Sequence, residues 1–118
     1  MPAAAPISAT ADLPSLSAGL CDALLTAATR AEMQSLLADL CTPAEIRSLA
    51  ERWHVARLLD QTPLSYRDIH EATGVSTTTI VRVARFLRHE PHRGYRMAID
   101  RLAGARLPTN RRGTPDVR

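Results

Sequence analysis

Lysine is absent from this sequence of 118 residues, and all 15 of its basic residues are arginine. A positive side chain that meets a phosphate therefore offers a guanidinium fork rather than an ammonium point charge. Aromatic residues are also scarce, with one Phe, one Trp and two Tyr. A hydrophobic core must therefore be built from aliphatic side chains.

Cysteine is rare as well, since only Cys21 and Cys41 are present. Both lie on apolar helical stretches, and we expect reduced core residues of a cytoplasmic protein. No apolar run has the length of a membrane span, so no membrane partner is expected. The Ala/Pro/Ser-rich start has no charged region before it, so we expect no secretory signal.

The residue patterns of common catalytic sites are missing too. There is no Gly-rich phosphate loop, no CxxC and no HExxH. The four histidines lack the companion cysteines or the paired spacing of a zinc site; they are His54, His70, His89 and His92. We therefore expect no catalytic residues, no metal and no cofactor, and we predict that the protein is not an enzyme.

What the sequence does contain is leucine and alanine in helical patterns, which predicts an all-α domain of about six helices. We expect a mobile segment over residues 1–14, a helical domain over 15–106, and a disordered basic tail over 107–118. Caps and breakers predict helices that start near Ser15, Thr29, Thr42, Ser65, Ser76 and Gly94. On the third helix, the predicted buried stripe is Ile46, Leu49, Ala50, Trp53, Ala56 and either Leu58 or Leu59.

The most informative stretch is residues 65–88, which has the pattern of a helix-turn-helix. Ser65 and Asp68 form a capping-box-like pair, and Gly74 supplies the left-handed conformation of a sharp turn. Ser76 caps the second helix, whose apolar stripe is Ile80, Val83, Ala84 and Leu87. The alternative is an ordinary helical hairpin inside an all-α protein.

Charge is distributed unevenly along the chain. Residues 1–64 hold 4 Arg against 7 acidic residues, a net charge of −3, whereas residues 65–118 hold 11 Arg against 5, a net charge of +6. A basic half that begins at the helix-turn-helix is typical of nucleic-acid binding. A solvated basic surface is the alternative.

Together, these residues resemble the Trp repressor superfamily, and more closely its YerC/YecD branch. The resemblance covers about residues 18–105 and rests on the "LC-T-x-x-E" start at Leu40, on the helix-turn-helix, and on the turn Arg93-Gly94-Tyr95. It implies an intertwined, all-helical homodimer. An aliphatic excess over residues 16–40 also favours a homodimer.

The resemblance also implies a set of residues that face double-stranded DNA. The predicted DNA-binding residues are Arg67, His70, Ser76, Thr77, Thr78, Val81, Arg82 and Arg85. Hydroxyls and arginines suit phosphates and base edges, and Val81 suits a thymine methyl. For His70, an ordinary exposed histidine is the alternative. Two readings of the function follow: a sequence-specific repressor on a palindromic operator, or a scaffold module that docks a protein through its basic face.

In Trp repressor, tryptophan lies between the core and the recognition helix. By resemblance, its ligands fall on Thr42, Arg52 and Arg82, which makes an amino-acid effector site an alternative. The next positions argue against tryptophan, because Val83 and Phe86 stand where the repressor has small residues and would fill the slot themselves. An ion pair of Arg52 with an acid such as Asp68, and a phosphate contact of Arg82, are the other readings.

Overall fold

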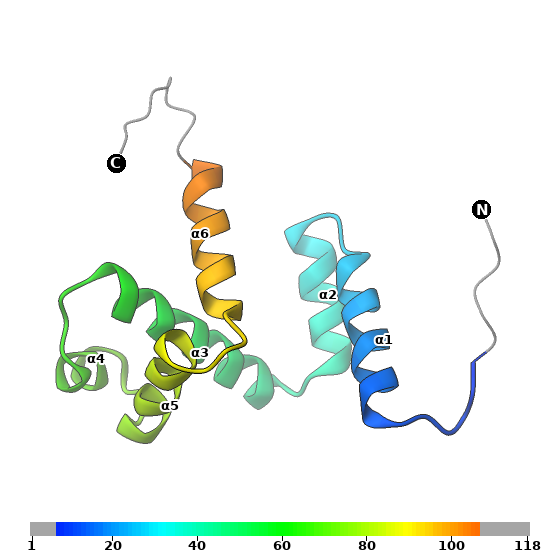
Figure 1. Ribbon diagram of the computed structural model, residues 1–118, viewed down its shortest axis with the longest axis horizontal. Coiled ribbons are helices and arrows are strands. Elements are labelled where there is room, and N and C mark those ends of the chain that lie inside the picture. Colours follow the sequence, from blue (N-terminus) through cyan, green and yellow to red (C-terminus); the bar gives the residue numbers. More distant parts are fainter. Residues whose placement is uncertain (1–6, 107–118) are drawn as a thin grey trace. The chain divides into compact units, whose positions relative to one another are not determined.

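A computed structural model describes residues 7–106 of the chain, and every regular element in that range is an α-helix (Figure 1). The helices are α1 (Leu13–Leu25), α2 (Arg30–Leu40), α3 (Pro43–Gln61), α4 (Tyr66–Thr73), α5 (Thr77–Arg88) and α6 (Gly94–Arg106). The all-α prediction is thereby confirmed. The predicted disordered tail lies outside the described residues, as do residues 1–6 of the predicted N-terminal segment.

Capping residues define where the helices begin, and most of the observed helix starts agree with those predicted from the sequence. α1 starts at Leu13, two residues before the predicted domain boundary, because the Asp12 side chain accepts a hydrogen bond from the Ser15 N–H. At the start of α3, the Thr42 hydroxyl accepts from the Glu45 N–H at 3.1 Å. The Thr42 N–H in turn donates to the Glu45 carboxylate at 2.8 Å, which completes the predicted capping box.

The helices fall into two compact units, which divide between Ile46 and Arg47. In the first unit, neither α1 nor α2 holds a buried residue. Leu16 and Leu20 of α1 are 59% and 45% exposed. The prediction that both cysteines are core residues is therefore wrong for Cys21, which is exposed, whereas Cys41 is half-buried; both are free thiols.

The second unit contains a core made only of aliphatic side chains, as the scarcity of aromatic residues predicts. α3, α4, the turn after α4 and α5 all contribute to it; its members are Val55, Ala56, Leu59, Ile69, Val75, Ile80, Val83 and Ala84. The predicted stripe of α5 is confirmed, with Leu87 half-buried against this core. On α3, the expectation was only partly right, because Leu49 and Ala50 are exposed and Val55, which the pattern missed, is fully buried.

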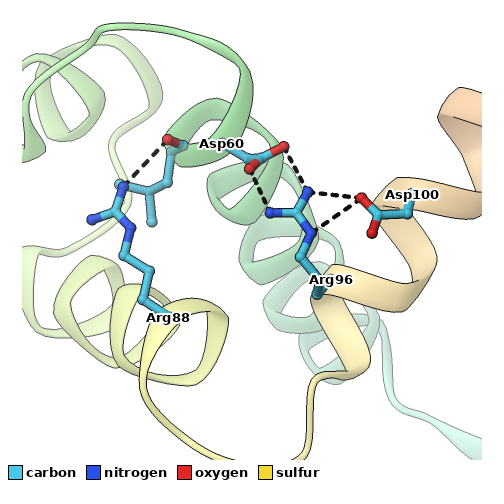
Figure 2. A network of polar contacts seen from close by, with 5 residues as sticks. Asp60, Arg88, Arg96 and Asp100 are labelled. Atoms are coloured by element: carbon cyan, nitrogen blue, oxygen red, sulfur yellow. Dashed lines mark hydrogen bonds and ion pairs between the residues drawn. The ribbon is translucent and has the colours of Figure 1, made fainter.

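The last helix, α6, packs against the rest of the second unit through a buried side chain, an aromatic contact and polar contacts. Ile99 is its buried residue, and Tyr95 stacks on Trp53 of α3 with the ring centres 6.4 Å apart. Figure 2 shows the polar part: the Arg96 guanidinium donates to both carboxylate oxygens of Asp60, at 2.8 and 3.0 Å, and also to Asp100. Arg88 of α5 donates to the Leu59 carbonyl at 3.4 Å.

This network shifts the pKa values of Asp60 and Arg96. The bidentate hydrogen bond from Arg96, aided by the charges of Arg96 and Arg88, holds the pKa of Asp60 below its ordinary value, against the opposing effect of burial. The same bond raises the pKa of Arg96. Both side chains are less than a third exposed, so water screens the pair only in part. The network therefore fixes α6 to the end of α3 near neutral pH.

Candidate nucleic-acid interface

The helix-turn-helix predicted from the sequence is formed by α4, the turn at residues 74–76, and α5. Ser65 and Asp68 make both bonds of the capping box, at 3.0 and 3.2 Å. Gly74 has φ of +77°, the left-handed conformation that glycine adopts without steric cost. The Ser76 hydroxyl accepts from the Thr79 N–H at 3.2 Å and so caps α5.

Side-chain hydrogen bonds hold the turn between these helices. The Thr73 hydroxyl donates to the Ile69 carbonyl at 2.6 Å and accepts from the Val75 N–H at 3.1 Å. His70 Nδ1 lies 2.7 Å from the Val75 carbonyl oxygen. Val75 itself is buried between the helices, as the pattern predicts. These bonds keep the orientation of α5 relative to α4 fixed.

All eight predicted DNA-facing residues are exposed, and they lie on this one motif: Arg67, His70, Ser76, Thr77, Thr78, Val81, Arg82 and Arg85. On α5, the exposed hydroxyls and arginines lie opposite the fully buried Ile80 and Val83. The structure thus brings these residues together on one surface. Their contact with DNA stays a prediction.

The arginines of this surface are not all free of partners. Arg67 pairs with Glu71 at 3.3 Å, and Arg85 pairs with Glu90 at 3.2 Å. Both pairs are largely solvent-exposed, so they stabilise the fold only weakly and can exchange for phosphate. The Arg82 guanidinium instead lies over the Phe86 ring, 4.4 Å from its centre.

One residue of the implied effector site, Arg82, lines a pocket within the second unit. Arg82 lines an open pocket of about 380 Å³, together with Val83, Phe86, His92, Gly94 and Tyr95. Arg52 lies on α3 and does not line it. Among residues 7–106, Arg52 makes no ion pair with an acid. The Asp68 carboxylate takes part in the cap of α4. Thr42 belongs to the other unit, where it caps α3.

Sequence reasoning missed several contacts around the motif. The Phe86 ring lies between arginines and a histidine, because Arg85 is 5.1 Å from its centre and His92 stacks on it at 5.9 Å. The bond of His70 to the turn was missed too, and so was the Asp60–Arg96 pair, whose partners are 36 residues apart. Only the Arg96–Asp100 spacing of i,i+4 is a signal that the sequence carries.

Across residues 7–106, no group of three or more His, Cys, Asp or Glu side chains lies close enough to hold a metal ion. Within the same range, every helix is too short or too polar to span a membrane.

Comparison with known proteins gives consistent results. The family model of the Trp repressor protein matches residues 16–103. The Uncharacterized protein YerC of Bacillus subtilis (strain 168) is 48% identical over 64 residues, which are 54% of this chain. The match spans 60% of the length of that relative.

Two solved structures are also similar to this chain. A TrpR like protein from Eubacterium eligens ATCC 27750 superposes with a TM-score of 0.70 and 37% identity, over 75% of this chain and 90% of that protein. A second solved structure, from Staphylococcus aureus, gives a TM-score of 0.70 and 38% identity, over 75% of this chain and 87% of that one. The likeness to these two proteins is therefore one of sequence as well as of fold.

Proposed function

Because this chain belongs to the Trp repressor family, we propose that it is a sequence-specific DNA-binding regulator, a repressor that binds a palindromic operator as a homodimer. One observation carries the proposal: α5 presents an exposed face of hydroxyls and arginines on a back that is fully buried at Ile80. Such a helix enters the major groove without exposing apolar core surface.

The parts of the motif have different tasks in this proposal. Arg67 and Ser76 contact phosphates and set the register, while Thr77 and Thr78 hydrogen-bond base edges. Arg82 and Arg85 add phosphate contacts, and Val81 packs on a thymine methyl. The net charge of +6 over residues 65–118 draws the motif to DNA.

The homodimer is supported by the first unit. α1 and α2 have no buried residue, yet Leu13, Leu16 and Leu40 are each at least half exposed. A face of this kind needs a second surface to cover it, and a second copy of the chain supplies one. A dimer places two copies of α5 about one DNA turn apart, which matches a palindrome.

We propose that operator binding needs no small-molecule effector. Val83 belongs to the core, and Phe86 occupies the space beside Arg82. The burial of Val83 and the position of Phe86 under the Arg82 guanidinium support this proposal. An effector in the pocket lined by Arg82 and Tyr95 is the alternative, and added tryptophan would then change the affinity for DNA.

The first test is selection of bound sites from a random duplex library, near physiological salt and with no ligand added. A recovered palindrome with half-sites about one helical turn apart is the expected result. The affinity should fall steeply as salt rises, because bound arginines release counterions from DNA. A weak salt dependence with no selected sequence would favour the scaffold reading instead.

Two variants separate base reading from phosphate contact. Thr78→Ala should cost about 1 kcal/mol on the selected operator and relax the preferred bases. Arg67→Ala should weaken binding to all sequences alike and reduce the salt slope by about one for each protomer bound. If both variants bind selected and random duplexes as the wild type does, the assignment of this face is wrong.

A further inference from the structure

His70 of α4 is fixed to the turn in a way that determines which of its nitrogens carries hydrogen. Its Nδ1 lies 2.7 Å from the backbone carbonyl oxygen of Val75. A carbonyl oxygen only accepts hydrogen bonds, so Nδ1 must be the donor. Neutral imidazole has a single N–H, and here that N–H is used inside the protein.

The second nitrogen, Nε2, is therefore a bare acceptor as long as His70 is neutral. The side chain is exposed, so Nε2 is available to a partner. A phosphate oxygen is also an acceptor, so neutral His70 and a phosphate cannot form a hydrogen bond. Once a proton from solvent binds Nε2, both nitrogens donate and the ring carries a positive charge.

Few charged groups surround this ring. On α4, Arg67 lies one turn earlier and pairs with Glu71, and the Tyr66 hydroxyl accepts from Arg88. The turn and the start of α5, residues 74–81, contain no titratable side chain. α3 faces α4 with core residues that are all aliphatic. None of the ion pairs described above includes His70.

We propose that His70 is a proton-linked phosphate contact: its imidazolium donates from Nε2 to a DNA phosphate, so that each protomer takes up one proton from solvent on binding. This proposal rests on the proposed function. Phosphate is favoured over a base because His70 lies on the first helix of the motif, which crosses the DNA backbone while the second helix reads the groove. DNA affinity therefore rises as the pH falls through the range in which histidine titrates.

The test measures DNA affinity of the full-length chain from about pH 8 to about pH 6 at constant ionic strength, on the selected operator and on a random duplex. Wild-type affinity should increase by up to about a hundredfold per pH unit, the limit for uptake of two protons by a dimer with one His70 in each protomer. His70→Gln should remove this increase on both duplexes. His54→Gln, at an exposed histidine of α3, is the matched control and should keep the wild-type slope.

A second measurement needs no DNA. The nitrogen-15 resonances of the imidazole at about pH 8, assigned by comparison with His70→Gln, should show hydrogen on Nδ1 rather than on Nε2. Hydrogen on Nε2 would overturn the proposal, and so would a wild-type pH slope that His70→Gln leaves unchanged. Affinity that rises with pH through His70 would mean that neutral Nε2 accepts from a base amino group, which also overturns it. Failure to bind either duplex at every pH would refute the proposed function and this proposal with it.

Discussion

The two units of this chain are both rich in leucine and alanine, yet they differ greatly in how many of their side chains are buried. The helix-turn-helix unit encloses a core in which Val55, Ile69 and Ile80 are fully buried, whereas α1 and α2 bury no side chain. Helical periodicity is thus enough to predict a helix, but a core also requires a second surface of matching shape. The first unit leaves leucines exposed, which the proposed function assigns to a partner copy, and the second leaves arginines exposed, which it assigns to DNA.

The largest expected effect tests whether α5 packs into the core of the second unit through Ile80. Ile80→Ala should lower the free energy of unfolding by about 3 kcal/mol, because it leaves a cavity in a tightly packed site. Val81→Ala is the matched control, since its side chain is next in sequence but 54% exposed, and it should change stability by less than about 0.5 kcal/mol. Urea denaturation measures both, and equal losses would contradict the assignment of the core.

The next effect tests whether the leucines of α1 cover a partner copy. The double variant Leu16→Ala, Leu20→Ala should weaken the homodimer by about 2 kcal/mol, roughly a 30-fold rise in its dissociation constant. Sedimentation equilibrium measures this constant. Val81→Ala should leave it unchanged, because that residue belongs to the DNA-facing surface. A double variant that associates as tightly as the wild type would show that α1 lies outside the dimer interface.

A smaller effect concerns the attachment of α6 to the second unit. Asp60→Asn should cost about 1.5 kcal/mol at neutral pH, because it breaks a partly buried, charge-assisted bidentate contact with Arg96. Asp100→Asn, at a side chain that is 65% exposed, should cost less than about 0.5 kcal/mol.

The pH dependence of this cost has a definite sign. The pKa of Asp60 is lowered in the folded protein, so its contribution is fully present above the ordinary carboxyl pKa of about 4. The contribution disappears as the pH falls through the lowered value, because both states are then protonated. Unfolding curves of wild type and Asp60→Asn should therefore converge in acid. A difference that persists there would mean that Asp60 acts through packing rather than through charge.

The smallest effect concerns the turn into α6. Arg93 has φ of +57°, a conformation that strains a residue with a Cβ. Arg93→Gly should relieve that strain and raise stability by about 0.5 kcal/mol, after the entropic cost of glycine in the unfolded chain. Arg101→Gly, at an exposed position inside α6, should have the opposite sign and cost about 1 kcal/mol. Two losses of equal size would show that Arg93 is not strained.

Sequence reasoning succeeded where structure is determined by near neighbours. The caps at Ser65 and Ser76, the left-handed Gly74 and the stripe of α5 depend on contacts within a few residues, and all were predicted. The start of α2 near Thr29 was predicted too: the Thr29 hydroxyl accepts from the Glu32 N–H, and the Glu32 carboxylate accepts from the Ala28 N–H.

Sequence reasoning failed where the burial or orientation of a side chain depends on residues that are distant in the sequence. α3 has apolar residues on more than one side, so its buried side is decided by where α4 and α5 pack, and Val55 was missed. The exposure of Cys21 depends on there being no covering surface within the unit, which no local pattern reveals. For the candidate site, the pattern located the exposed face, but not the bond that orients His70 or the stacking of Arg82 on Phe86.

The stacking of Trp53 on Tyr95 has a practical consequence. Trp53 is the single tryptophan of the chain, and no Tyr, Trp or Phe precedes it. Intrinsic fluorescence therefore reports only on the unit that carries the helix-turn-helix, and specifically on the contact between α3 and α6. Far-ultraviolet circular dichroism reports on all six helices at once. Recorded on the same sample, the two signals separate the unfolding of α1 and α2, which contain no fluorescent residue, from the unfolding of the unit that carries the helix-turn-helix.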